Sequence, residues 1–216
     1  QSKKGIEKCS TNRIKYPRTY HLPWSTPSSD DKIIPSTSIF DGREVILTKK
    51  MDGENSSLYS DGLHARSIDY SSHESRNWLK AFWSRICGDI PENYRLCVEN
   101  LYAVHSIKYE SLKSYFMLFS VWDGLKCLSW SETIEWAELI GVETVPILYS
   151  GIYNEELIKS IKLDLDKDEG YVIRLSDSFS YRDFKKSVAK YVRKNHVHSH
   201  GHWMKKKVEV NLLELK

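Results

Sequence analysis

Lys50-Met51-Asp52-Gly53-Glu54-Asn55 is the stretch that decides how this chain of 216 residues is interpreted. On its own, a lysine followed by Asp-Gly one residue later is a short pattern that about one chain in twenty of this length contains by chance. It gains weight from the acidic, aromatic and basic residues that follow it in order: Glu99, Trp122-Asp123, Glu169-Gly170 and Lys190. The ordered set suits group transfer through a lysine amine.

Strands are predicted on both sides of this stretch. Residues 44–49 are typical of a strand, and residues 56–67 of a hairpin that turns at Asp61-Gly62, a pair favoured in type I′ turns. The Lys-x-Asp-Gly run therefore lies between strands. Further short apolar stretches predict strands at 94–99, 115–122, 145–149, 171–175 and 188–192.

Three helices are predicted between these strands. Apolar residues recur at helical spacing over 74–86, and Gly88 follows where a helix would stop. A second helix would be capped by Ser131 and stop at Gly141, and Asn154 would cap a third. Strands outnumber helices and do not alternate regularly with them, so the fold class is α+β with largely antiparallel sheets flanked by helices.

Length and charge set the organisation. The chain fits one domain, and we expect residues 1–38 to be an ordered arm packed on a domain of residues 39–216, because the aromatic side chains in 16–24 need a surface to pack on. The net charge of +3 does not identify a polyanion binder. Basic residues near the two ends form either solvated surface or a phosphate track: Arg13, Lys15, Arg18, Lys185, Lys186, Arg193, Lys194, Lys205, Lys206 and Lys207.

The cysteines and the apolar stretches favour a cytoplasmic protein. The four cysteines are widely spaced and include no Cys-x-x-Cys pair, which favours reduced thiols. The longest strongly apolar stretch, 115–122, is too short to cross a bilayer, and the polar start Gln1-Ser2-Lys3-Lys4 is no secretory signal. We therefore expect no association with a membrane.

Lys50 can be a nucleophile only as the free amine. Its reference pKa of about 10.4 would have to fall by roughly three units, which corresponds to about 4 kcal/mol. Burial together with positive charge from Lys190 and a divalent cation can supply this. The competing interpretation of Lys50 alone is an exposed lysine beside an Asp-Gly turn.

Two carboxylates stand at strand ends and suit a metal or a ribose. Glu99 ends one apolar strand and Glu169 precedes another. Mg²⁺ prefers oxygen ligands and keeps several waters, so one or two carboxylates beside a triphosphate suffice. Surface ion pairs are the alternative for both residues. Trp122 closes a strand, where it can stack on a purine or pack in the core.

These residues carry a resemblance to a known family. The chain resembles the ATP-dependent RNA ligases, a branch of the covalent nucleotidyltransferases that also include DNA ligases and mRNA capping enzymes. The resemblance runs from Tyr16-Pro17-Arg18 through His202-Trp203-Met204 and is carried by four segments: Asp52-Gly53-Glu54-Asn55, Ala65-Arg66-Ser67, Glu99-Asn100-Leu101-Tyr102 and Glu169-Gly170-Tyr171-Val172. It implies an ATP-grasp-like nucleotidyltransferase domain that uses ATP with Mg²⁺ or Mn²⁺.

The resemblance also implies a reaction. Lys50 would attack the α-phosphate of ATP to give lysyl-AMP, AMP would pass to an RNA 5′-phosphate, and a 3′-hydroxyl would then displace it. The implied contacts, residue by residue, are the phosphate or RNA end for Arg66, ribose or hydrated metal for Glu99, adenine for Trp122, metal for Glu169, the α-phosphate for Lys190 and nick sealing for Asn55. Asp52 would shape the site around Lys50.

One departure from the family pattern matters, and length favours RNA ligases over DNA ligases and capping enzymes. Many of these ligases carry a second lysine two residues after the one that matches Lys190, but this chain has Val192 there, and Arg193 or Lys194 would have to replace it. Only 26 residues follow Lys190, too few for the OB-fold domain of DNA ligases and capping enzymes. We therefore expect no OB-fold, and RNA held by the arm at 13–24 and the basic C-terminal stretch, with Trp24 or Tyr20 available for stacking.

The role of the C-terminal histidines and the exact activity have more than one interpretation from the sequence. His196, His198, His200 and His202 alternate, so on a strand they would share one face, either as a transition-metal site or as a polar C-terminal segment. The predicted activity is joining of RNA 3′-OH and 5′-phosphate ends in RNA repair, with an end-healing kinase or phosphatase as a partner. The alternatives are a non-catalytic module that binds RNA ends or nucleotides, and a ligase that seals DNA nicks.

Overall fold

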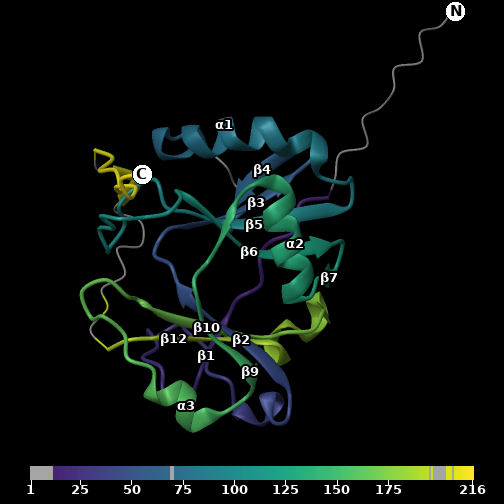
Figure 1. Cartoon of the computed structure of the whole chain (residues 1–216), viewed down its shortest axis with the longest axis vertical. Helices are drawn as coiled ribbons and strands as arrows, with labels where there is room; N and C mark the ends of the chain where they lie inside the picture. Colours follow the sequence, from purple (N-terminus) through teal and green to yellow (C-terminus); the bar gives the residue numbers. More distant parts are fainter. Residues whose placement is uncertain (1–11, 69–70, 195, 197–202, 206) are drawn as a thin grey trace, which may run out of the picture.

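The computed structural model describes residues 12–68, 71–194, 196, 203–205 and 207–216. In this part of the chain, strands form two sheets and helices cover their outer sides (Figure 1). The strands are β1 (Tyr20–His21), β2 (Glu44–Lys50), β3 (Glu54–Tyr59), β4 (Gly62–Ala65), β5 (Tyr94–Asn100), β6 (Phe116–Asp123), β7 (Lys126–Cys127), β8 (Glu143–Thr144), β9 (Ile147–Ile152), β10 (Gly170–Leu175), β11 (Phe179–Ser180) and β12 (Val188–Val192). The helices are α1 (Asn77–Ile86), α2 (Trp130–Ile140) and α3 (Glu155–Ser160), with short 3₁₀ turns between elements.

One sheet has five strands in the order β1-β12-β10-β2-β9. The other has seven, in the order β11-β7-β6-β5-β3-β4, with β8 paired to β6. Most of the pairings are antiparallel; among the named strands of the described residues, only β1 with β12 and β6 with β8 run parallel. The α+β class with largely antiparallel sheets is therefore confirmed.

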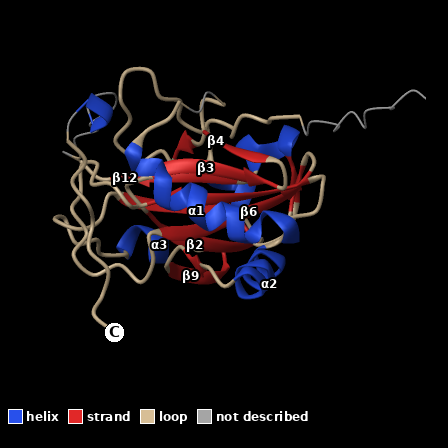
Figure 2. Ribbon diagram, turned by 90° about the horizontal axis from the view of Figure 1, so that it is seen from above, coloured by secondary structure: helices blue, strands red, loops and turns tan. Residues whose placement is uncertain are grey.

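The helices bury their apolar faces on these sheets. Leu79, Phe82 and Ile86 of α1 pack with Leu58, Leu96 and Leu118 of the seven-stranded sheet, and Ala137 of α2 joins the same cluster. Ile158 of α3 packs with strand residues of the five-stranded sheet. Figure 2 shows these layers from above. Within the described part of the chain, no helix has both the length and the apolar character that crossing a bilayer requires.

The N-terminal residues 12–38 pack against both sheets. Tyr20–His21 pairs with β12, and Leu22 and Ile34 are buried with the five-stranded sheet. The ring of Tyr16 is in edge contact with Phe119 and Trp122 of β6. The aromatic residues of this segment thus contribute to the core, while a domain boundary at residue 38 stays a prediction.

Several predicted element ends are corrected. The hairpin turns at Ser60 and Asp61, because Gly62 already pairs with Tyr59, and Asp61 lacks the positive φ that a type I′ turn needs. Ser129, not Ser131, caps α2: its hydroxyl accepts from the backbone N–H of Glu132, whose carboxylate accepts from the Ser129 backbone in return. The strand predicted at 145–149 lies at Ile147–Ile152.

Other predictions are confirmed. Gly141 ends α2 with a φ of 67°, a left-handed conformation that costs glycine little. The side chain of Asn154 caps α3 by accepting from the backbone N–H of Leu157 at 3.0 Å. The strands β2, β10 and β12 fall within one residue of their predicted bounds. The described cysteines Cys87, Cys97 and Cys127 are free.

Candidate active site

Lys50 is the last residue of β2 and forms a buried ion pair with Glu169. In the sheet register, Lys50 lies opposite Gly170, so the residue before β10 comes next to the lysine. Lys50 Nζ donates to Glu169 Oε1 at 2.7 Å, and the two side chains are 24% and 1% exposed. The pairing of two strands thus brings together two residues that are 119 positions apart.

Gly53 and Gly170 each follow a carboxylate residue of the site, and at both positions the backbone of a neighbouring segment lies too close for a side chain. A Cβ at Gly53 would lie 2.5 Å from the carbonyl oxygen of Asn100 and 2.8 Å from Leu101 Cδ2. A Cβ at Gly170 would overlap the carbonyl oxygen of Tyr191. Any side chain at either position would displace a neighbouring strand. The Asp-Gly and Glu-Gly pairs therefore have a steric reason.

Asp52 fixes the loop that follows β5. Its Oδ2 accepts from the backbone N–H groups of Ser106 and Ile107 at 2.8 and 2.7 Å. Its own backbone N–H donates to the hydroxyl of Tyr109 at 2.9 Å. Asp52 is 9% exposed, so these contacts replace most of the water that a carboxylate would otherwise hold. The predicted role of Asp52 in shaping the site around Lys50 would rest on these contacts.

Glu99 and Asn55 lie opposite each other on β5 and β3. Glu99 Oε1 accepts from the backbone N–H of Gly53 at 3.1 Å. Burial raises the pKa of Glu99 to about 8; the Lys50 charge opposes this effect and Glu169 adds to it. The buried Oδ1 of Asn55 finds no hydrogen-bond partner within the described residues. Arg66 is exposed and donates its backbone N–H to the Asn55 carbonyl at 3.1 Å.

Lys50 and Lys190 have pKa values that shift in opposite directions. Burial by itself would lower the pKa of Lys50, but Glu169, Glu99 and Asp52 outweigh burial, and the pKa is raised. Burial lowers the pKa of Lys190 on β12, and the charges of Lys50 and Arg66 lower it further. Without a bound cation, Lys50 therefore carries its proton and is no nucleophile.

Asp52, Glu169 and His196 can hold a metal ion. One ligand atom from each lies within 4.8 Å of the others. His196 Nε2 is 3.6 Å from Glu169 Oε1, and both side chains are 1% exposed. Burial lowers the pKa of His196, which favours the neutral imidazole that a metal needs. Two carboxylates and an imidazole fit Mg²⁺ or Mn²⁺, with Mn²⁺ the better match for the nitrogen ligand.

This group differs from the predicted metal ligands. The sequence pointed to Glu169 and Glu99, whereas the structure groups Glu169 with Asp52 and His196. His196 was missed as a partner of Glu169 because nothing in the local sequence places it there. Its predicted companions, His198, His200 and His202, lie outside the described residues.

Trp122 requires a correction. Its side chain is fully buried, with the guanidinium of Arg95 4.6 Å from the ring centroid and Phe184 stacked at 6.3 Å. Tyr16 and Phe179 contact the same ring edge-on. A ring enclosed in this way has no face left for adenine. The core-packing interpretation of Trp122 is therefore the correct one. Among the other predicted site residues, Asp52, Glu99 and Glu169 raise the pKa of Lys50, and Lys190 is near enough for Lys50 to lower its pKa.

The fold and the paired Lys50 define a nucleotidyltransferase-like protein with a buried lysine and carboxylate site. Residues 43–192 match the family model described as RNA ligase, and the chain belongs to that family. A comparison with curated proteins gives no match.

Solved structures with the same fold include ligases from Naegleria gruberi and Aquifex aeolicus. The Naegleria gruberi RNA ligase with PPi has a TM-score of 0.54 and 20% identity, over 84% of this chain and 61% of that one. A variant of that ligase with ATP and Mn has a TM-score of 0.52 and 20% identity, over 83% and 60% of the two chains. A candidate ATP-dependent DNA ligase from Aquifex aeolicus has a TM-score of 0.56 and 18% identity, over 82% and 49%. The present chain thus spans about three fifths or less of these proteins.

Proposed function

We propose that the chain is an ATP-dependent RNA ligase that works through a lysyl-AMP intermediate. The observation that carries the proposal is the ion pair between Lys50 and Glu169, beside ligand atoms of Asp52 and His196. Pure nucleotide binding does not require a lysine at the centre of three carboxylates. The family match and the ATP-bound Naegleria structure support ATP as the nucleotide.

The proposed reaction has three steps. Lys50 Nζ, as the free amine, forms a bond to the α-phosphorus of ATP, and the bond to pyrophosphate breaks. The 5′-phosphate of an RNA then takes AMP from Lys50, which leaves as the amine. Finally a 3′-hydroxyl attacks the activated 5′-phosphate, loses its proton and displaces AMP.

The site residues divide this work. A divalent cation held by Asp52, Glu169 and His196 would offset phosphate charge and counter the carboxylates that keep Lys50 protonated. Lys190 would bind the α-phosphate, and the exposed Arg66 would bind the phosphate of ATP or of an RNA end. Glu99 would bind the ribose. The buried Oδ1 of Asn55 can accept a hydrogen bond from the 3′-hydroxyl.

A covalent label tests the proposal. We expect α-labelled ATP with Mg²⁺ or Mn²⁺ to label the protein, Lys49→Arg to be labelled equally, and Lys50→Arg to give no label. Lys49 is the matched control because it pairs with Asp168 at 2.9 Å on the opposite face of the strand. Arginine preserves a charged partner for Glu169 but is no nucleophile. A folded protein that takes no label would leave the non-catalytic binding module instead.

The substrate class needs a second assay. The Aquifex aeolicus match makes DNA nick sealing the competing activity. We expect the labelled protein to seal a nick with an RNA 3′-OH strand and to seal the matched DNA nick slowly. Joining of RNA 3′-OH and 5′-phosphate ends in cytoplasmic RNA repair, with a kinase or phosphatase that prepares the ends, is the role that this activity would fit.

A further inference from the structure

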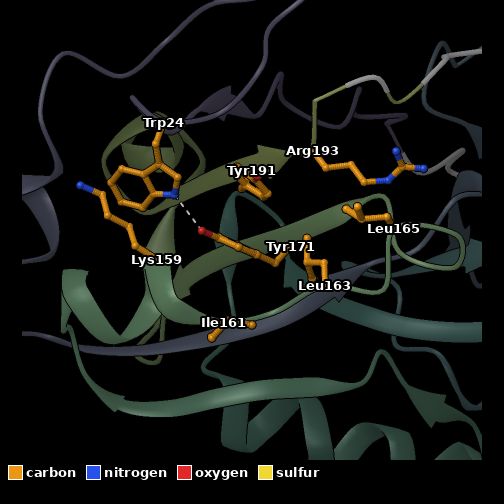
Figure 3. A pocket seen from close by; sticks show the side chains of 8 residues that line it. All are labelled: Trp24, Lys159, Ile161, Leu163, Leu165, Tyr171, Tyr191 and Arg193. Atoms are coloured by element: carbon orange, nitrogen blue, oxygen red, sulfur yellow. Dashed lines mark hydrogen bonds between the residues drawn. The ribbon is translucent and has the colours of Figure 1, made fainter.

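A pocket of about 360 Å³ lies on the face of the five-stranded sheet opposite to Lys190. Its lining side chains come from the arm, from α3 and the segment after it, from β10, and from β12 and the residue after it, and we call it the back pocket (Figure 3). They are Trp24, Lys159, Ile161, Leu163, Leu165, Tyr171, Tyr191 and Arg193. Because successive strand residues alternate between faces, Tyr191 and Lys190 point to opposite sides of the sheet.

The floor of the back pocket is aromatic and held in place. The rings of Tyr171 and Tyr191 stack with centroids 4.7 Å apart, and Tyr171 is only 2% exposed, so Tyr191 and Trp24 offer the accessible ring surface. Trp24 Nε1 donates to the Tyr171 hydroxyl at 2.8 Å, which fixes the indole at one end of the pocket. Ile161, Leu163 and Leu165 form an apolar wall. Flat apolar rings beside an apolar wall suit a planar heterocycle such as a nucleobase.

Cations stand at both ends of this floor. Lys159 Nζ lies 4.6 Å from the centroid of the Trp24 ring. Its ion pair with Glu155, at 3.7 Å and with both side chains about half exposed, neutralises it weakly. At the other end, Arg193 Nε donates to the carbonyl oxygen of Asp168 at 2.7 Å, and no ion pair of the described residues includes Arg193. An internal RNA nucleotide has a phosphate on each side of its base, which matches a cation at each end.

The back pocket is joined to the catalytic edge of the sheet. The backbone N–H of Arg193 donates to the carbonyl oxygen of Glu169 at 3.0 Å, and Val192 and Lys50 flank Gly170 on its two sides. An RNA strand whose end lies at Lys50 can therefore pass over this edge of the sheet, where Arg193 is the first residue of the back pocket that it reaches. We propose that the back pocket binds a base of single-stranded RNA, with its flanking phosphates at Arg193 and Lys159. This rests on the proposed function, whose RNA substrate it extends by a second contact.

An exposed leucine gives the test without disturbing the fold. Leu165 is 66% exposed at the rim of the pocket, and Leu139 on α2 is 71% exposed on the other sheet's helix layer. We expect Leu165→Glu to weaken binding of a fluorescent twelve-nucleotide uridine RNA about fivefold or more, as loss of one stacked base and one phosphate contact does. Leu139→Glu, with the same charge change, should bind like the parent protein. Leu165→Lys should bind more tightly.

Photo-crosslinking locates the contact on the unmodified protein. RNA with 5-iodouridine should crosslink to Trp24 or Tyr191, and free AMP should not compete because it offers only one phosphate. Equal affinities of Leu165→Glu and Leu139→Glu, or crosslinks that map only outside the back pocket, would overturn the proposal. The two proposals fail separately: a protein that takes no label from ATP but crosslinks here retains the RNA pocket, and one that takes label but never crosslinks here loses it.

Discussion

The Lys50 site has two ends, each with a lysine, and the pKa values of these two lysines shift in opposite directions. At the carboxylate end, Glu169, Glu99 and Asp52 surround Lys50 and raise its pKa. At the cation end, Lys190 lies near Lys50 and Arg66, and its pKa is lowered. Burial acts in the same direction on both lysines, so the difference comes from their neighbours. The two lysines, for which we propose the roles of nucleophile and phosphate ligand, thus differ in the charges around them.

The comparison bears on how Lys50 would become reactive. The lysine with the lowered pKa is not the predicted nucleophile, because the carboxylates that would hold a metal also stabilise the charge on Lys50. A cation on those carboxylates would cancel that stabilisation, and burial would then dominate for Lys50 as it does for Lys190.

The largest effect is expected at Glu169. Glu169→Gln retains the shape of the side chain but removes one negative charge from the metal ligands. We therefore expect label formation to slow about 100-fold, and the Mn²⁺ concentration that gives the half-maximal labelling rate to increase. The measurement is the rate of labelling by α-labelled ATP across a Mn²⁺ titration. Asp168→Asn is the matched control, since Asp168 pairs with Lys49 outside the Lys50 site. An unchanged Mn²⁺ requirement in Glu169→Gln would remove Glu169 from the metal site.

A smaller effect is expected at the cation end. Lys190→Met removes a charge that would face the α-phosphate, and we expect label formation to slow about tenfold. The pKa of His21 offers an independent readout, because burial lowers it and Lys190 lowers it further. It should rise in Lys190→Met, as measured by NMR titration, and stay unchanged in Lys126→Met, which lies on strand β7 of the other sheet. Equal labelling of the two variants would leave Lys190 with a structural role only.

The sequence predicted those parts of the site that short-range patterns encode. The apolar strands that end at Lys50 and begin after Glu169 place both residues at the same sheet edge. The cap of α2 could also have been found, because Ser129 and Glu132 have the capping-box spacing whereas Ser131 has no such partner. Local chemistry was sufficient in these cases.

The remaining features depend on contacts between distant segments. Arg95 lies opposite Trp122 in the sheet, and Tyr16 arrives from the arm, so the burial of Trp122 follows from partners that its own strand does not reveal. His196 reaches Glu169 only after the chain has left β12. The back pocket combines side chains from four separate segments. Sequence periodicity describes one helix or strand at a time and cannot show contacts between residues that are far apart in the sequence.

The smallest effect concerns protein stability at the carboxylate end. Burial raises the pKa of Glu99 to about 8, far above its value in the unfolded chain. Between these two pKa values the folded protein binds a proton that the unfolded chain has lost, so this group's contribution to stability is present at low pH and falls as the pH rises toward 8. Glutamine mimics the protonated acid at every pH. We expect Glu99→Gln to unfold like the parent near pH 4.5 and to be more stable near pH 8, measured by urea unfolding without divalent cations. The rise of the pKa from 4.5 to about 8 sets an upper limit of about 5 kcal/mol on this gain, at about 1.4 kcal/mol per pKa unit. A constant difference across this range would mean that Glu99 is ionised at neutral pH, and Lys50 would then face three full negative charges.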